Sequence, residues 1–370
     1  MKVAIIMPLG EQKGGGEKRL WDLMLEGEKS DLQWLLIFQQ KGSLVEKVRN
    51  LGIDTRVVSS GRLREPYKII ASIIKIASII KKEKADVVLS WMWKAHIYGC
   101  PASIFAGVPS LWSQLEAPND YWLKRLFTYL PTTGIFINSE SGKTILQKMR
   151  PDKPIRMVYP GVALERFDPS KLPSLTDARK KLDLPANAPI IGIVGRLQKW
   201  KGMHVLIQAM PKVLKRYPDT HCLIVGGEHE FEPDYEKYLR KLIKDLRLEK
   251  QVTITGFQNN VPEWMQAMDV VVHASDNEPF GIVVVEAMAL GKPVVAADNG
   301  GPTEIITDGL NGLLTPFGDS KALADAIVRY LENKDFATHI GIAARKRSLD
   351  FSTHKYAENF IQGIKELTPT

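Results

Sequence analysis

Two carboxylates lie on either side of a predicted helix start. Residues 276–288 read Asp-Asn-Glu-Pro-Phe-Gly-Ile-Val-Val-Val-Glu-Ala-Met, and the proline and glycine in this segment predict a turn and then a helix from near Ile282. Glu278 precedes the helix, and Glu286 lies four residues into it. With a rise of about 1.5 Å per residue, the two acids are roughly 10 Å apart, and the N–H groups of the first turn lie between them.

This spacing suits an extended ligand with a phosphate in the middle. The backbone N–H groups of Phe280, Gly281 and Ile282 would bind the phosphate, because a helix N-terminus favours a negative charge. Carboxylates accept hydrogen bonds from hydroxyl groups, so Glu278 and Glu286 would bind hydroxyls on either side. A nucleotide sugar has this order of groups. Glu286 has apolar neighbours in the sequence, which favours a buried, ligand-binding carboxylate over an ordinary exposed one.

Two basic residues follow another predicted strand. The apolar run at 189–194 leads into Arg196, and Lys201 precedes the next predicted helix. A planar guanidinium group and an ammonium group beside a helix N-terminus suit a diphosphate. Ligands usually bind at the carboxyl ends of parallel strands, so we favour a diphosphate site over an ordinary pair of surface charges.

A glycine-rich turn follows the first apolar run. Gly14, Gly15 and Gly16 precede a predicted helix, and glycine lets backbone N–H groups approach an anion closely. The spacing differs from G-x-G-x-x-G, which excludes a dinucleotide fingerprint. An anion-binding turn and a plain flexible turn both fit this segment.

Short apolar runs, separated by segments with helical spacing, predict the elements that position these residues. Such runs are typical of strands buried on both faces of a parallel sheet. The first half contains runs at 3–7, 34–38, 86–89, 110–112 and 134–137. The second half contains runs at 189–194, 222–225, 252–254, 270–273, 293–296 and 312–314. The pattern predicts an α/β protein with two Rossmann-like parallel-sheet domains and a ligand cleft between them, a boundary near residue 165, and a last helix at 353–367.

Composition narrows the class of protein. The chain has 370 residues, of which 44% are hydrophobic and 25% charged, as expected for two globular domains. The two cysteines, Cys100 and Cys222, are far apart, which excludes a disulfide framework and a cysteine zinc site. The first apolar run is too short for a signal peptide, and no segment has the ~20 apolar residues of a membrane span. We therefore expect a cytoplasmic protein.

The positive charge is concentrated in the first half. Residues 1–170 hold 25 basic and 17 acidic residues, so the net charge of +8 falls within them. A basic surface attracts phosphorylated acceptors, anionic lipids or nucleic acid, although surplus lysines on a solvated surface give the same count. The segment 67–82 places Ile69, Ile70, Ile73, Ile74, Ala77 and Ile80 on one helical face, which fits core packing or, less well, an anionic membrane surface.

Taken together, the motifs resemble the family four (GT4) retaining glycosyltransferases with the GT-B fold. The glycine-rich turn, Arg196 with Lys201, the acids Glu278 and Glu286, and the Gly-Gly-Pro-Thr-Glu segment at 300–304 stand in that family's order. The resemblance implies an acceptor-binding domain at 1–165, a donor-binding domain at 166–350, and a helix at 351–370 that packs back towards the first domain. It implies a nucleotide diphosphosugar as donor, UDP- or GDP-linked, with no other cofactor and no metal.

The resemblance also assigns roles to residues. Arg196 and Lys201 would bind the donor diphosphate, Glu286 the ribose hydroxyls, and the backbone of Val261 the base. Glu278, with the backbone of Phe280, Gly281 and Ile282, would bind the transferred hexose. We count Arg196, Lys201 and Glu278 as catalytic, and add Gly15 and Gly16 to the donor-binding residues.

One position departs from the family pattern on the acceptor side. A histidine often follows the strand before the acceptor loop, and this sequence has Leu115 there. His96 would substitute for it, unless it is an ordinary histidine near a helix start. Gln114 and Glu116 flank the same position and are further acceptor-side candidates.

The predicted function is therefore transfer of a hexose to an acceptor hydroxyl. The acceptor would be a glycan or a lipid-linked glycan, and the basic first half would contact the inner face of an anionic membrane. A nucleotide-sugar epimerase shares the two-domain plan and stays an alternative. A basic nucleic-acid-binding protein is a more distant one, because the tryptophans at 91, 93 and 112 do not form a basic aromatic stripe; we expect no nucleic-acid partner.

Overall fold

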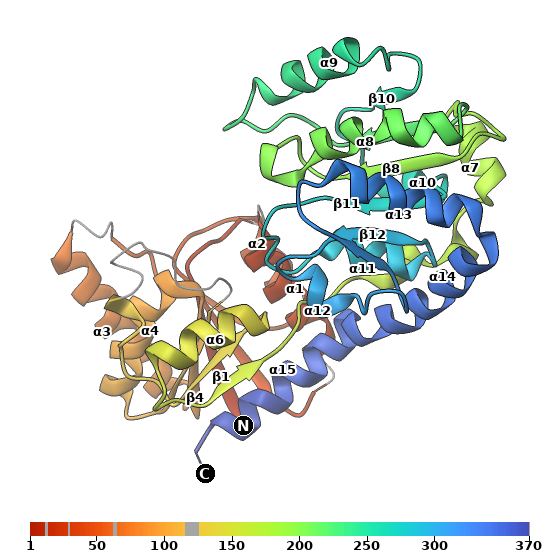
Figure 1. The fold of residues 1–370 in the computed structure, drawn as a ribbon. Helices are drawn as coiled ribbons and strands as arrows, with labels where there is room; N and C mark the ends of the chain where they lie inside the picture. The colour runs from red at the N-terminus through yellow and green to blue at the C-terminus, as the bar shows by residue number, and fades with distance from the viewer. Residues whose placement is uncertain (12–13, 29, 62–64, 115–125, 370) are drawn as a thin grey trace. The chain divides into compact units, whose positions relative to one another are not determined.

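The computed structural model describes residues 1–11, 14–28, 30–61, 65–114 and 126–369 (Figure 1). The chain forms two compact units. Unit 1 is Met1–Gly161 together with Thr353–Thr370, and unit 2 is Val162–Ser352. Each unit is an α/β structure built on one parallel sheet.

Unit 1 contains a seven-stranded sheet within the described residues. Its strand order is β3-β2-β1-β4-β5-β6-β7, and every neighbouring pair is parallel. The strands are β1 (Lys2–Met7), β2 (Gln33–Phe38), β3 (Asp54–Val57), β4 (Val87–Trp91), β5 (Ser110–Ser113), β6 (Gly134–Ile137) and β7 (Ile155–Met157).

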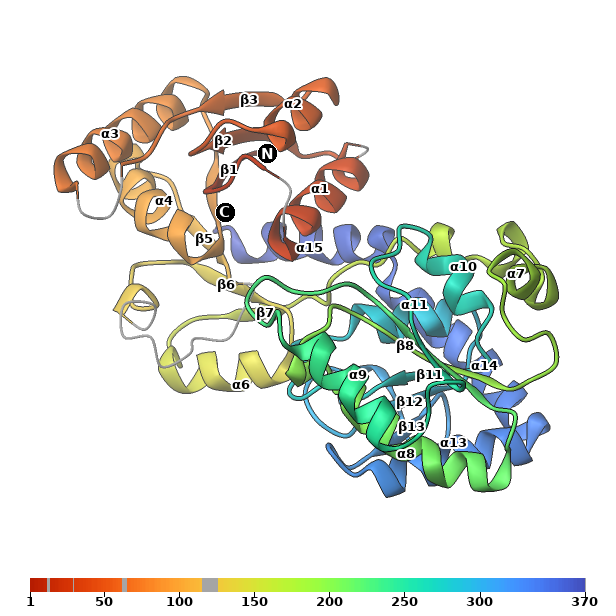
Figure 2. The ribbon, with the colours of Figure 1, turned by 90° about the horizontal axis from the view of Figure 1, so that it is seen from above.

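Helices cover both faces of this sheet (Figure 2). Alternate side chains of a strand point to opposite faces. Ile5 packs towards α1 (Gly15–Gly27), α2 (Ser43–Asn50) and α15 (Thr353–Leu367), whereas Ile6 packs towards α3 (Pro66–Lys82) and α4 (Met92–Ala106). The described part of unit 1 also contains α6 (Glu140–Met149).

The last helix of the chain belongs to unit 1. Phe360 of α15 stacks on Phe136 with ring centroids 4.2 Å apart and lies 5.4 Å from the Trp91 ring. Tyr356 is buried in the same core and donates to the carbonyl oxygen of Arg19 in α1. Aromatic pairs of this kind add to the apolar burial that fixes the helix on the sheet.

Unit 2 contains a six-stranded sheet in the order β10-β9-β8-β11-β12-β13, again with parallel neighbours throughout its described residues. The strands are β8 (Ile190–Val194), β9 (His221–Val225), β10 (Val252–Ile254), β11 (Val270–His273), β12 (Val294–Ala297) and β13 (Leu313–Thr315). The helices are α7 (Leu175–Lys181), α8 (Met203–Arg216), α9 (Tyr235–Asp245), α10 (Val261–Gln266), α11 (Ile282–Ala289), α12 (Pro302–Ile305), α13 (Ser320–Glu332) and α14 (Lys334–Ser348). Four short 3-10 helices complete the described part: η1 (Leu164–Phe167), η2 (Pro169–Lys171), η3 (Lys199–Lys201) and η4 (Leu349–Phe351).

All eleven predicted strands are present, and two strands were missed. Both missed strands, β3 and β7, lie at the edges of the first sheet. The prediction for 67–82 was wrong in part: Ile73, Ile76, Ala77 and Ile80 are buried, whereas Ile70 and Ile74 are each 58% exposed. No helix in the described residues is long and apolar enough to cross a membrane.

Candidate active site

The candidate site of unit 2 forms where the strand order reverses. β8 and β11 are neighbours in the sheet, and the chain leaves them in opposite directions, β8 towards β9 and β11 towards β12. Such a switch point leaves a crevice at the carboxyl ends of the two strands. Arg196 and Lys201 follow β8, and Glu278 follows β11, so the topology brings these predicted residues to one edge of the sheet.

Lys201 and Glu278 form an ion pair at this edge of the sheet. Their side chains are only 16% and 15% exposed, so the pair is shielded from water and interacts more strongly than a surface pair. The ammonium group of Lys201 also lies 3.9 Å from the centre of the Trp200 ring. Sequence reasoning had predicted both charged residues but had not paired them.

A histidine that the sequence analysis missed completes this group. Nε2 of His273 lies 3.5 Å from Oε2 of Glu278 and 3.3 Å from Oγ of Ser275. Burial alone would raise the pKa of Glu278, but the hydrogen bond from His273 and the charge of Lys201 outweigh it and lower the pKa to about 2. Glu278 is therefore ionised at neutral pH. The position of His273 as the last residue of a predicted strand could have identified it.

Two glycine contacts set the backbone around this group. Gly202 has φ +75°, and a Cβ there would overlap the carbonyl oxygen of Ala274 in the loop after β11. Gly301 donates its N–H to the carbonyl oxygen of Glu278 at 2.7 Å, and a Cβ on Gly301 would overlap the backbone of Phe280. Only glycine allows these close approaches. The Gly-Gly-Pro-Thr-Glu segment therefore positions the backbone that carries Glu278.

The predicted helix start is also present. α11 begins at Ile282, and Gly281 before it has φ +103°, a left-handed conformation that suits glycine. No side chain of the described residues caps this helix, so the backbone N–H groups of its first turn can bind an anion. Glu286 lies in the middle of α11 and is half-buried, whereas the sequence pattern predicted a buried carboxylate.

Arg196 is exposed at the carboxyl end of β8. Its Nη1 lies 3.2 Å from Nε2 of His229, in the loop after β9, which holds the guanidinium group at this edge of the sheet. Val261 is the first residue of α10 and is half-buried. Phe257, in the loop before α10, is 76% exposed. Its ring offers an apolar surface near the predicted base position.

The predicted donor residues Gly15 and Gly16 belong to unit 1. They form the first turn of α1, and no side chain among the described residues caps its start. The carbonyl oxygen of Gly16 accepts a hydrogen bond from Nε1 of Trp91 at 3.0 Å, which ties the turn to the end of β4. A Cβ on Gly15 would meet open space, so this side of the turn is accessible. Their donor role stays a prediction.

The acceptor-side candidates lie in different surroundings. His96 is fully buried in α4, with its ring stacked on Trp112 at 4.7 Å. Burial and then the charge of Arg150 lower the pKa of His96 to about 3, so its ring is neutral. Gln114 is buried at the end of β5 and lines a small cavity with Arg19. Leu115 and Glu116 lie outside the described residues.

The described residues contain no group of three or more histidine, cysteine, aspartate or glutamate side chains that could hold a metal ion. The charges gathered at the switch point are instead those of Arg196, Lys201 and Glu278. The arrangement can bind an anion between cations and backbone N–H groups, with a carboxylate beside it as a hydrogen-bond acceptor.

Comparison with known proteins finds similar glycosyltransferases. Residues 175–347, within unit 2, match the model of the family described as Glycosyl transferases group 1. It is 35% identical over 219 residues to a D-inositol 3-phosphate glycosyltransferase of Corynebacterium urealyticum, covering 58% of this chain and 51% of that protein. It is 35% identical over 162 residues to the lipopolysaccharide core biosynthesis glycosyltransferase LpsE of Rhizobium meliloti, covering 44% and 45%. The chain thus spans about half the length of these curated relatives.

Solved structures match both units. HepE of Anabaena in complex with UDP has a TM-score of 0.84 and 26% identity, covering 99% of this chain and 100% of HepE. A second HepE structure, with a TM-score of 0.78, contains UDP-glucose. The predicted fold class is confirmed: the chain is an α/β protein with two Rossmann-like parallel-sheet units of the GT-B type.

Proposed function

We propose that this protein transfers a hexose from a nucleotide diphosphosugar to an acceptor hydroxyl. The observation that carries the proposal is the group of Arg196, Lys201 and Glu278 at the switch point of unit 2, which matches the model of the group 1 glycosyl transferases. HepE, similar to this chain over its whole length, is seen with UDP and with UDP-glucose. A UDP-sugar is therefore the first donor to test, with a GDP-sugar as the alternative.

The donor would bind along unit 2 in the order of the residues. The base lies against the backbone of Val261, and the ribose hydroxyls donate to Glu286. The diphosphate lies between Arg196, Lys201 and the first turn of α11, and a hexose hydroxyl donates to Glu278. In this arrangement the phosphate replaces Glu278 as the partner of Lys201. Gly15 and Gly16 contribute N–H groups from unit 1 in the same proposal.

The cations act on the bond-breaking step. When the bond between the anomeric carbon and the phosphate oxygen breaks, negative charge grows on the diphosphate. This growing charge is stabilised by Arg196, Lys201 and the N–H groups at the start of α11. Because these groups stabilise the transition state more than the ground state, they lower the barrier. Because they supply the positive charge themselves, we propose that the reaction needs no metal ion.

We further propose that the anomeric configuration is retained. The acceptor oxygen forms its bond to the anomeric carbon on the face that the diphosphate leaves, and the acceptor proton passes to a diphosphate oxygen. No side chain of the described site is then needed as a covalent nucleophile. Analysis of the product anomer by NMR tests this step, and an inverted product would contradict it.

The acceptor side rests on unit 1. We propose a glycan or lipid-linked glycan acceptor, since LpsE acts in lipopolysaccharide core biosynthesis. Tyr67, Ile70 and Ile74 form an exposed apolar stripe on α3, and exposed lysines including Lys75 flank it. Apolar side chains beside lysines suit an anionic membrane surface, where a lipid-linked acceptor would be presented.

A panel of nucleotide sugars measured by thermal shift tests the donor. A ligand that binds only the folded state stabilises it by an amount that grows with the logarithm of the ligand concentration relative to its Kd. We expect one UDP- or GDP-sugar to raise Tm and Lys201→Gln to remove the shift. Incubation with that donor alone should leave the sugar unchanged; a stereoisomer of the donor sugar formed without acceptor would favour an epimerase and contradict the proposal.

A further inference from the structure

A cavity lies within unit 2 at the amino ends of its strands, opposite the carboxyl ends where the candidate active site lies. The cavity has a volume of about 1200 Å³. Its lining includes Pro189, Asp269 and Pro293, which directly precede β8, β11 and β12. The candidate active site follows the carboxyl ends of the same strands, so the two sites are separated by the length of the sheet.

The cavity wall is strongly basic. Five of its described lining residues are cationic and one is acidic; the cations are Arg179, Lys292, Lys334, Arg345 and Lys346. The acid, Asp269, is already bound: it pairs with Arg179 at 2.6 Å and accepts the N–H of Ile190 at 2.6 Å. Arg345 pairs with Asp168 at 3.2 Å. The uncompensated positive charge of the cavity therefore comes from its lysines.

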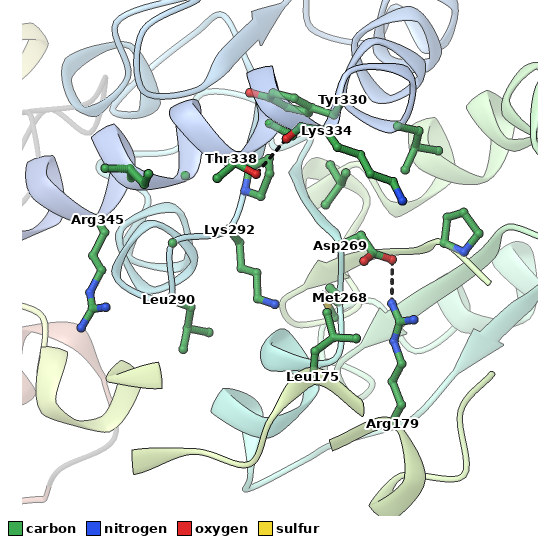
Figure 3. Close-up of a pocket in the computed structure, with 18 of the residues that line it drawn as sticks. Leu175, Arg179, Met268, Asp269, Leu290, Lys292, Tyr330, Lys334, Thr338 and Arg345 are labelled. Atoms are coloured by element: carbon green, nitrogen blue, oxygen red, sulfur yellow. Dashed lines mark hydrogen bonds and ion pairs between the residues drawn. The ribbon is translucent and has the colours of Figure 1, made fainter. Parts of the chain in front are cut away.

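Lys292 is the most unusual of these residues. It follows α11, is only 8% exposed, and extends into the cavity (Figure 3). Burial lowers the pKa of Lys292 to about 8. The negative charge of Asp269 raises this pKa, and the positive charge of Arg179 lowers it further, but burial has the largest effect. In the described part of the chain, its Nζ makes one hydrogen bond, to the carbonyl oxygen of Gln266 at 2.7 Å. An ammonium group has three donors, so two remain for a ligand.

Apolar side chains form much of the rest of the wall, which also contains Asn187 and Thr338. Leu175, Met268, Leu290, Leu331 and Ile342 all line the cavity. Ile342 projects from α14 and is 65% exposed, beside the cationic residues of the same helix. A hydrophilic anion would leave this apolar surface unused, whereas a neutral apolar ligand would leave the buried ammonium group without a counter-ion.

We propose that this cavity binds one molecule of a soluble amphiphilic anion. A phosphate or carboxylate group contacts Lys292 and Lys334, and an alkyl or ring portion lies against the apolar residues between α7 and α14. The site is separate from the donor site, and the proposal does not depend on the reaction catalysed there.

The position of Lys292 links the two sites through one helix. α11 begins in the candidate phosphate site and ends at Ala289, three residues before Lys292. Two residues after the end of α11, Gly291 contacts α14. A Cβ on Gly341 of α14 would overlap the carbonyl oxygen of Gly291. The anion and the donor would thus bind at opposite ends of α11, and both can be bound at once.

Isothermal titration calorimetry of the whole protein tests the proposal, with octyl phosphate, inorganic phosphate and octanol as probes. We expect octyl phosphate to bind at least about tenfold more tightly than either of the others, because it uses both parts of the cavity. Lys334 is exposed, so Lys334→Gln should fold normally and weaken octyl phosphate binding about tenfold. Lys292→Met should abolish the preference for octyl phosphate over octanol. Lys250→Gln, an exposed lysine outside the cavity, should change nothing.

Three results would overturn the proposal. The first is equal binding of octanol and octyl phosphate, which would show that no anion site exists. The second is displacement of octyl phosphate by a UDP-sugar with loss of binding in Lys201→Gln, which would place the anion in the donor site. The third is binding only to vesicles of anionic lipid, weakened by Lys334→Gln, which would show a membrane contact instead of a pocket for one molecule. Failure to bind any donor would affect only the proposed function.

Discussion

Lys201 and Glu278 form an ion pair across the switch point of unit 2, although 77 residues separate them in the sequence. The pair brings together a cation expected to bind phosphate and a carboxylate expected to bind a sugar hydroxyl. In this pair each group neutralises the charge of the other. We infer that donor binding exchanges this contact for two others, with phosphate on Lys201 and a hydroxyl on Glu278.

Removal of the Lys201 charge should impair turnover. Lys201→Gln keeps a polar side chain but loses the charge that stabilises the leaving diphosphate, so kcat/KM should fall roughly 100- to 1000-fold. Steady-state kinetics with the donor found in the thermal-shift panel measure this loss. Lys199→Gln is the matched control, because Lys199 is exposed and lies two residues away in the same turn. Equal kinetics for the two variants would argue against a role for Lys201.

Stability should depend on pH through Glu278. Its folded-state pKa of about 2 lies below the ordinary value of 4.5, so its ionised form stabilises the folded protein above pH 4.5. This contribution is lost as the pH falls from 4.5 towards 2. Urea unfolding gives the free energy of unfolding of the wild type and of Glu278→Gln. The wild type should exceed the variant by less at pH 3.5 than at pH 7, and this excess should fall by on the order of 1 kcal/mol. A difference that stays constant would show that the carboxylate is not held by Lys201 and His273.

Gly202 should tolerate no side chain. Gly202→Ala places a Cβ against the Ala274 carbonyl oxygen at a positive φ, so it should both destabilise unit 2 and displace Lys201. Gly256 also has a positive φ, of +71°, but a Cβ there meets open space. Gly256→Ala should therefore cost only the backbone strain, about 1 kcal/mol, and Gly202→Ala clearly more. Urea unfolding compares the two variants, and equal losses would contradict the close approach.

The apolar stripe of α3 should bind anionic membranes. Ile70→Ser combined with Ile74→Ser removes exposed apolar groups that do not belong to the core, so the fold should persist while sedimentation with anionic liposomes decreases. Leu310→Ser, an equally exposed change in unit 2, serves as the control. Binding should weaken with salt, because lysines contribute. Sedimentation that is unchanged by the double substitution, or equal with neutral liposomes, would rule out this surface.

Strands with an apolar run could be predicted from the sequence, and these include the edge strands β10 and β13 of unit 2. The two edge strands of unit 1, β3 and β7, could not. β3 contains Asp54 and Arg56, which pair with each other, and Arg56 also pairs with Glu83. β7 has three residues, all half-buried. In β3 and β7, charged residues interrupt the apolar run that identifies a strand.

Local motifs predict the charged residues of the candidate site but not the contacts of its histidines. The chemistry of Arg196, Lys201, Glu278 and the start of α11 depends on local motifs, which the sequence displays directly. The contact of His229 with Arg196 joins the loops after two different strands, β9 and β8, and so arises from the strand order, which an apolar pattern does not specify. The contact of His273 with Glu278 joins the end of β11 to the loop after it, and it depends on how that loop folds back. The exposure of Ile70 and Ile74 likewise depends on how α3 packs in unit 1.

The structure of a complex with the intact sugar nucleotide tests the central claim most directly. We predict that diphosphate oxygens lie within hydrogen-bond distance of Arg196, of Lys201 and of the N–H groups at the start of α11. Glu286 should accept hydrogen bonds from the ribose, and Glu278 from the hexose. A diphosphate bound elsewhere, with Lys201 still paired to Glu278 and both carboxylates directed away from the ligand, would contradict the account.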